Sequence, residues 1–412
     1  MQFSQIIGQD TTKEQLVHMV SSNRLSHALL FLGKEGNGAL SLARALAQYI
    51  VCENTGGKER VKQKAAAEPA MQSLFGEAEP LPPTPATPQE TFPADACGIC
   101  PACKKAAEMI HPDIHFTYPV IPQKSGDKPK SIDFIRQWRE FQTKSPYGNA
   151  YDWLQFIGAE NKQGNIYTHE IPEIIHQMNL KSFESEYKIL IIWQPEALGN
   201  EANKLLKLIE EPPPNSLFIL VSENESQILP TILSRTQLVK IPALSEQEIA
   251  NALQQQQGLS AEQARQISIL AQGNYLEALQ QIQNSDADWD VLLRDWMNTI
   301  IRTGPQAQLK WIEDFCKNGR EKQKQFLKYF IQMLEFCVRQ RYTSVDESTS
   351  KNYAFSVKFN RITSPEQQAL ILQELEQAIY YIERNANSKM LFHALTIKLY
   401  HIITNKSVIL MY

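Results

Sequence analysis

The chain has 412 residues, of which 43% are hydrophobic, and a formal net charge of −4. This length predicts about two to four globular domains, and the slight acidity excludes a basic surface for nucleic acid over the whole chain. No basic stretch followed by an apolar run opens the sequence, and runs such as Ile189–Trp193 are too short to span a bilayer. We therefore expect a soluble, cytoplasmic protein without membrane contact, whose cysteines are metal ligands or buried thiols.

A glycine-rich loop follows the first predicted strand, Leu29–Leu32. Gly33 and Gly38 have the spacing of a phosphate-binding loop, which reads G-x-x-x-x-G-K-[ST] between a strand and a helix. Ala39 stands where the lysine of such a loop would reach the β- and γ-phosphates, and Leu40 replaces the hydroxyl residue that would hold Mg²⁺. The sequence thus predicts a nucleotide-binding fold that has lost its phosphate chemistry.

Four cysteines carry the strongest metal signal. Cys97, Cys100 and Cys103 form two overlapping C-x-x-C steps, and Cys52 supplies a fourth thiol. Four thiolates make a closed, tetrahedral Zn²⁺ site, which is structural rather than catalytic. A redox C-x-x-C pair and plain buried thiols are the alternatives. His111 could replace one ligand, although we expect a loop or core histidine there.

The rest of the chain alternates between polar segments and regular elements. Residues 54–95 are proline-rich and lack periodic hydrophobicity, which predicts a flexible insertion. Residues 131–180 are expected to be mostly helical, with a break near 145–148. Short apolar runs at Lys188–Trp193 and Ser216–Val221 have the character of buried parallel strands.

A third such strand is predicted at Gln237–Ile241, and a helical pattern that ends at Pro212 lies between the first two. Alternating strands and helices predict a parallel sheet with crossover helices. Only helical patterns follow Ser245.

The strand that ends at Trp193 lacks the acidic pair of an ATP-hydrolysing site. Trp193 and Gln194 occupy the positions where carboxylates would hold Mg²⁺ and polarise water, and Glu196 falls two residues beyond them. Together with Ala39 and Leu40, this second loss indicates that the chain does not hydrolyse ATP by itself.

Arg235 follows an apolar helical pattern that ends at Leu233. An arginine at an exposed helix end can project into a neighbouring subunit and stabilise γ-phosphate charge, as an arginine finger does. On position alone, a surface arginine or one that caps the helix is the simpler interpretation.

Several blocks of the sequence resemble the bacterial clamp loader subunits of DNA polymerase III, which are AAA+ proteins, with the delta-prime subunits as the best match. The blocks are Phe3–Gln9, Arg24–Phe31, Cys97–Cys103, His111–Asp113, Ala202–Pro213 and Leu229–Arg235. The patterns LLK-x-x-EEPP and LP-x-x-LSR are highly specific together. The resemblance covers about residues 1–52 and 97–285, and beyond them it rests on helical character only.

The resemblance implies an α/β AAA+ fold with a parallel sheet, a degenerate P-loop-like site and three domains. A nucleotide-binding-like domain would span residues 1–243 and contain a zinc module, residues 52–103, with the insertion 54–95. A helical lid, residues 244–285, and an all-α collar that mediates oligomerisation, residues 286–412, would follow.

The family's functional residues map onto this sequence with a few departures. Its zinc ligands map onto Cys52, Cys97, Cys100 and Cys103. Its arginine finger maps onto Arg235, where Thr236 replaces the family's cysteine. Leu276 stands where the sensor arginine of the lid is expected, which makes a third missing ATP contact.

The resemblance therefore implies a non-catalytic clamp loader subunit of the DNA polymerase III holoenzyme, which helps to load the sliding clamp onto primed DNA and supplies Arg235 in trans. Structural Zn²⁺ is the expected cofactor, and we do not expect ATP binding. The implied partners are gamma/tau-type ATPase subunits and the delta subunit, with the clamp and primed DNA reached through the complex. The alternatives are an active ATPase of the gamma/tau type and a zinc-dependent nucleic-acid-binding module.

Overall fold

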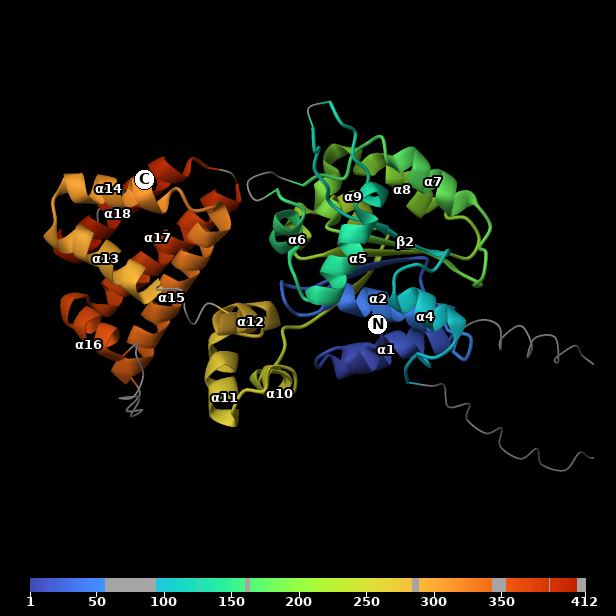
Figure 1. Cartoon of the computed structure of the whole chain (residues 1–412), viewed down its shortest axis with the longest axis horizontal. Helices are drawn as coiled ribbons and strands as arrows, with labels where there is room; N and C mark the ends of the chain where they lie inside the picture. Colours follow the sequence, from blue (N-terminus) through green and yellow to red (C-terminus); the bar gives the residue numbers. More distant parts are fainter. Residues whose placement is uncertain are drawn as a thin grey trace, which may run out of the picture. The chain divides into compact units, whose positions relative to one another are not determined.

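The computed structural model of the chain forms two compact units, Met1–Gln281 and Ile282–Tyr412, which we describe separately (Figure 1). The described residues are 1–55, 94–124, 126–159, 164–283, 289–342, 353–384 and 386–405. The predicted insertion, residues 54–95, lies outside them except at its ends. Among the described helices, none combines the length and the apolar character that a membrane span requires.

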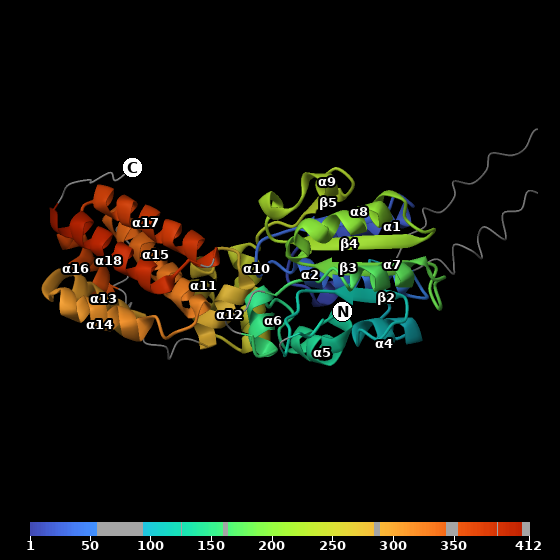
Figure 2. The same ribbon diagram turned by 90° about the horizontal axis from the view of Figure 1, so that it is seen from above.

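The first unit is built around a five-stranded parallel sheet in the order β2-β3-β4-β1-β5, which confirms the predicted sheet. The strands are β1 (Ala28–Leu32), β2 (Ile114–Thr117), β3 (Lys188–Trp193), β4 (Ser216–Ser222) and β5 (Gln237–Lys240). Figure 2 shows β2, β3 and β4 side by side. Four strands fall on predicted positions, whereas β2 was not predicted. It is a four-residue edge strand with half-buried positions, so it lacks a continuous apolar run.

Helices cover both faces of this sheet (Figure 1). One face carries α1 (Asp10–Ser21), α2 (Ala39–Val51), α4 (Pro101–Ala107), α5 (Ile135–Lys144) and α6 (Ala150–Phe156). The other carries α7 (Ile171–Asn179), α8 (Ala202–Glu210) and α9 (Pro230–Leu233). Short 3₁₀ helices are η1 (Phe3–Gln5), η2 (Ser131–Phe134), η3 (Pro195–Glu201) and η4 (Glu225–Gln227). Every residue of α2 is buried, as expected of a helix that packs centrally against a sheet.

The predicted helical region between residues 131 and 180 is divided into α5, α6 and α7. The predicted break near 145–148 lies between α5 and α6. The region is mostly helical, as predicted, with a second interruption. The described residues between Phe156 and Ile171 are not helical, and Asn165 bridges to Val120 as an isolated antiparallel pair.

Three helices follow the sheet: α10 (Glu246–Gln257), α11 (Ala261–Leu270) and α12 (Tyr275–Gln283); the last two residues of α12 belong to the second unit. Ser245 and Ser260 begin the first two as N-caps, each in a capping box with the residue three positions on. These helices coincide with the predicted lid, whose status as a separate domain stays a prediction.

The described part of the second unit consists of helices, as its sequence pattern predicted. They are α13 (Trp289–Arg302), α14 (Pro305–Phe315), α15 (Arg320–Tyr342), α16 (Tyr353–Ile362), α17 (Pro365–Glu383) and α18 (Ser388–Asn405). Their common core contains the fully buried side chains of Trp296, Phe326, Phe330 and Phe392.

Candidate metal centre and a closed phosphate loop

The four predicted cysteine ligands come together in the structure. The sulfur atoms of Cys52, Cys97, Cys100 and Cys103 all lie within 4.8 Å of one another, and those of Cys97 and Cys103 are 3.9 Å apart. A tetrahedron with Zn–S bonds of about 2.3 Å has sulfur–sulfur edges of about 3.8 Å. Cys52 and Cys103 are buried and the other two are half-buried. The cluster therefore fits a tetrahedral metal such as zinc.

The end of α2, the start of α4 and the short segment just before α4 position these sulfurs. Cys52 directly follows α2, and Cys100 is the N-cap of α4, where its Sγ accepts the backbone N–H of Cys103 at 3.3 Å. Pro101 occupies the first helical position, where its missing N–H costs nothing. The N–H of Cys97 donates to Sγ of Cys52 at 3.4 Å. The second C-x-x-C step, Cys100 to Cys103, therefore also forms the N-terminus of α4.

The cysteine loop is tied to the first residues of the chain, which the sequence did not indicate. The carboxylate of Asp95 accepts the backbone N–H groups of Phe3 and Ser4, each at 2.9 Å. Nε2 of Gln2 donates to the carbonyl oxygen of Ala96 at 2.7 Å. A metal that orders the cysteine loop would thus also order the N-terminal segment.

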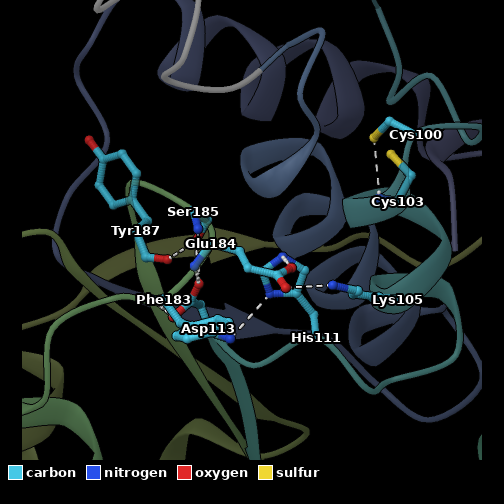
Figure 3. Close-up of polar contacts among 9 residues, drawn as sticks. All are labelled: Cys100, Cys103, Lys105, His111, Asp113, Phe183, Glu184, Ser185 and Tyr187. Atoms are coloured by element: carbon cyan, nitrogen blue, oxygen red, sulfur yellow. Dashed lines mark hydrogen bonds and ion pairs between the residues drawn. The ribbon is translucent and has the colours of Figure 1, made fainter.

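His111 lies outside the cysteine cluster, in a polar network next to it (Figure 3). Its Nδ1 accepts the N–H of Asp113 at 3.1 Å, and the buried carboxylate of Asp113 accepts the N–H groups of Phe183, Glu184 and Ser185 at 2.6–2.9 Å. Burial alone would raise the pKa of Asp113, but these three donors hold it below its ordinary value. The H-P-D block therefore fixes the loop that precedes β3.

The same loop is linked to α4. Nζ of Lys105 lies 2.5 Å from one carboxylate oxygen of Glu184, and the other lies 3.9 Å from Nε2 of His111 (Figure 3). Burial lowers the pKa of His111. The ring faces carboxylates rather than sulfur, which agrees with the expected loop or core histidine and not with the alternative ligand.

The glycine-rich loop between β1 and α2 is filled by a side chain of its own. Asn37 is buried, its Oδ1 accepts the N–H of Ala39 at 3.2 Å, and its Nδ2 donates to the carbonyl oxygen of Ile241 at 2.9 Å. A Cβ added to Gly33 would lie only 2.1 Å from that Nδ2. Backbone N–H groups of such a loop normally face phosphate oxygens. Here Asn37 takes the N–H of Ala39 instead, while Ala39 and Leu40 form the buried first turn of α2.

Two further side chains, from other segments of the chain, pack against glycines of this loop. The ring of Tyr147 lies 2.9 Å from where a Cβ on Gly38 would be, and its hydroxyl accepts the N–H of Ile7 at 2.9 Å. Asn274 lies just before α12. Its Oδ1 would be only 1.8 Å from a Cβ added to Gly36. Sequence reasoning missed these residues because neither belongs to a phosphate-loop motif.

The other ATP-contact positions are occupied by residues with protein partners. Trp193 is buried, and Gln194 donates from Nε2 to Glu223 at 2.8 Å. Glu196 is half-buried, Oγ of Ser222 donates to its Oε1, and burial raises its pKa. Leu276, at the position of the lid's expected sensor arginine, is buried. Trp193, Gln194 and Leu276 therefore supply no carboxylate or guanidinium for a nucleotide at the three expected contact positions.

Arg235 lies two residues beyond α9 and is partly exposed. Its Nη1 donates to the carbonyl oxygen of Thr231 at 2.9 Å and to Oγ of Ser234 at 3.2 Å. Its Nη2 lies 2.5 Å from Oε1 of Glu210, the last residue of α8. Thr236 does not disturb this end, because its hydroxyl donates to the carbonyl oxygen of Ile232 at 3.0 Å. The ion pair with Glu210 was not predicted.

A cavity of about 300 Å³ lies beside the edge strand β2. Its lining combines apolar residues with titratable ones, which include His115, Arg139, Glu170 and Glu173. Burial raises the pKa of Glu170 to about 7 and lowers that of His115 to about 4. No motif in the sequence indicated this cavity.

The chain is similar to known replication proteins. A family model described as DNA polymerase III, delta subunit, matches residues 8–74 and 86–245. A DNA polymerase III subunit delta' of Bacillus subtilis is 25% identical over 272 residues, which are 66% of this chain and 58% of the relative. The delta' subunit of Pseudomonas aeruginosa is 28% identical over 211 residues, 51% of this chain and 41% of the relative.

A gamma/tau subunit of Mycobacterium bovis is 23% identical over 235 residues, 57% of this chain and 27% of the relative. Each match therefore spans less than two thirds of the relative's own length. The residues matched by the family model are more than half of the chain and include the phosphate loop, the four cysteines and Arg235. They confirm the resemblance to the delta-prime subunits of the clamp loader. The chain belongs to the DNA polymerase III delta subunit family.

Proposed function

We propose that the chain is a non-catalytic clamp loader subunit in DNA replication, with an AAA+ domain that has lost its own ATP site. The observation that carries this proposal is the closure of the phosphate loop by Asn37, Tyr147 and Asn274. Asn37 would have to release the N–H of Ala39 before a phosphate oxygen could bind there, and Tyr147 and Asn274 pack against two glycines of the same loop. The absence of a lysine at Ala39 would then leave the β- and γ-phosphates without their cation.

We further propose that Arg235 acts in trans, on ATP bound by a neighbouring subunit. It remains partly exposed at a helix end, while the chain's own phosphate loop is closed. A guanidinium is always charged and offers a planar set of donors suited to phosphate oxygens. Arg235 would therefore stabilise γ-phosphate charge in the ATP site of a neighbouring subunit.

We also propose that Cys52, Cys97, Cys100 and Cys103 hold one structural Zn²⁺. The metal would supply a cross-link between the end of α2 and the start of α4 and no reaction step, because four thiolates leave no open coordination position. The deep burial of Cys52 and Cys103 supports a closed site of this kind.

The partners follow from the family. Gamma/tau-type ATPase subunits would provide the ATP site that Arg235 enters, and the delta subunit would belong to the same assembly. The helices of residues 286–412 would form the collar that joins the subunits, and the sliding clamp and primed DNA would be reached through the complex. This work would take place in the cytoplasm.

The test is ATP binding and hydrolysis by the purified chain, alone and mixed with the gamma/tau-type and delta subunits of its organism. We expect no turnover by the chain alone, co-elution with the other subunits, and DNA-stimulated hydrolysis in the mixture. Arg235→Ala should lower that rate several-fold, since a finger is worth about 10³-fold or more at the single site it serves. Lys240→Ala, at an exposed cation on β5, is the control and should leave the rate unchanged.

An unchanged rate of DNA-stimulated ATP hydrolysis with Arg235→Ala would refute the proposal that Arg235 acts as an arginine finger. Turnover by the chain alone would instead establish an active ATPase of the gamma/tau type. Salt-dependent DNA binding by the isolated chain would favour a nucleic-acid-binding module.

A further inference from the structure

The guanidinium of Arg235 is held by two different helices of its own chain. Nη1 contacts Thr231 and Ser234 at the end of α9, and Nη2 contacts Glu210 at the end of α8. Glu210 and Arg235 are far apart in sequence, so their contact depends on the fold and not on helix periodicity. Contacts from two sides fix both the position of the guanidinium and the direction of its plane.

Glu210 itself stands on a well-anchored part of the fold. Ile209, its neighbour, is buried, and the carbonyl oxygen of Ile209 lies 3.0 Å from Nε2 of His27, directly before β1. The helix α8 ends at Glu210 itself, two residues before Pro212, which could not continue it. A carboxylate on such an element can orient a partner, because the element does not have to be ordered first.

The contacts of Arg235 leave room for a ligand. A guanidinium carries five N–H donors, and the described contacts of Arg235 use three of them. Two donors therefore remain for phosphate oxygens while Glu210 keeps its place. This arrangement orients the arginine and does not block it.

Stability does not account for this pair. The side chains of Arg235 and Glu210 are 36% and 42% exposed, and exposed ion pairs contribute little to folding. Placement matters much more for a group that acts on a transition state, where a displacement of about 1 Å can cost about 10²-fold in rate.

We infer that Glu210 is a positioning residue, which holds the Arg235 guanidinium ready for the γ-phosphate of a neighbouring subunit. This inference rests on the proposed function of Arg235 and adds a second residue to it. Glu210 touches no nucleotide in this scheme and acts only through the arginine.

The experiment measures DNA-stimulated ATP hydrolysis by the reconstituted clamp loader complex with four single variants of this chain. Glu210→Gln should lower kcat about three- to ten-fold without changing KM for ATP, because the loss is confined to the transition state. Glu210→Asp keeps the charge and should recover part of the rate. Glu211→Gln, at the exposed neighbouring carboxylate, is the matched control and should behave like the unmodified chain. Arg235→Ala is measured in parallel.

The double variant Glu210→Gln/Arg235→Ala separates positioning from a general structural effect. If Glu210 acts through Arg235, the double variant should be as slow as Arg235→Ala and no slower. A further loss in the double variant would overturn the inference, as would an unchanged or raised kcat with Glu210→Gln while Arg235→Ala is slow. If Arg235→Ala itself has no effect on the rate, the proposed role of Arg235 as an arginine finger is refuted, and so is the positioning role of Glu210.

Discussion

At the scale of single residues, the carboxyl group of Glu170 has the environment with the clearest consequence for stability. The residue is 5% exposed, and its Oε1 accepts the N–H of Ser131 at 3.1 Å. Its Oε2 has no hydrogen-bond partner among the described residues. Burial is the main cause that raises its pKa from 4.5 to about 7. The folded chain therefore favours the neutral carboxyl.

We expect Glu170→Gln to raise the free energy of unfolding at pH 8 and to leave it nearly unchanged at pH 4. The folded pKa lies above the unfolded one, so the folded chain binds more protons between about pH 4.5 and 7, and its stability falls as the pH rises through this window. The shift corresponds to at most about 3 kcal/mol at pH 8. Urea unfolding at pH 4, 6 and 8 measures it.

Glu173→Gln is the control for this prediction. Glu173 is about half exposed and forms an ion pair with Lys130, so its loss should slightly destabilise the chain at neutral pH. An unfolding free energy of Glu170→Gln that follows the unmodified chain at all three pH values would contradict the expectation.

The residues that could be predicted from sequence are those with fixed spacing. The four cysteines and the phosphate-loop positions Ala39 and Leu40 were found this way, because local motifs specify them. Asn37, Tyr147 and Asn274 could not be found, since their roles arise from contacts among segments far apart in the chain. The sequence showed that the phosphate chemistry was missing but not which side chains occupy its place.

At the scale of elements, three of the four strands that the sequence predicted are buried, and the fourth, β5, is a mostly exposed edge strand. β1, β3 and β4 are largely buried along their length and read as continuous apolar runs. The edge strand β2 contains His115 and only four residues, so no run marks it. The order of the strands also escaped prediction, because pairs such as β1 with β4 join residues far apart in the chain.

The cysteine cluster leads to a prediction at the same scale. We expect the purified chain to contain one zinc ion, and Cys52→Ser to lose it. At free Zn²⁺ of 1,000 times Kd, the metal would stabilise the chain by about 4 kcal/mol. Hydrogen exchange should become faster at residues 94–103, and at Phe3 and Ser4 because Asp95 holds their N–H groups. Metal analysis measures the zinc content of the two proteins, and hydrogen exchange measured by mass spectrometry or NMR reports the change in protection.

Cys316→Ser is the control, since this cysteine lies in the second unit and outside the cluster. It should retain the zinc and the exchange pattern of the unmodified chain. A Cys52→Ser variant that still holds one equivalent of zinc would exclude the four-thiolate site.

At the scale of the whole molecule, the two units have separate hydrophobic cores. The sheet of the first unit is packed on both faces within Met1–Gln281, whereas the core around Trp296 and Phe330 lies entirely within Ile282–Tyr412. Units with their own cores can unfold independently. Stability and function of the chain can therefore be disturbed in one unit at a time.

Phe330→Ala tests this independence. Phe330 is fully buried, and its ring centroid lies 6.0 Å from that of Trp296 and 6.1 Å from that of Phe359. Removing the ring should cost about 3–5 kcal/mol within the second unit. Hydrogen exchange should then become faster in α13–α18 and stay unchanged in β1, β3 and β4, whereas Tyr381→Ala, at a residue 41% exposed, should change neither.

The same variant connects the second unit to assembly. If residues 286–412 form the collar, Phe330→Ala should lose co-elution with the gamma/tau-type subunits at temperatures where the second unit unfolds, while the sheet of the first unit remains protected. Faster exchange in β3 and β4 would show instead that the chain unfolds as one cooperative body. Undiminished co-elution with an unfolded second unit would place the assembly surface in the first unit, because only folded helices can present a packed collar face.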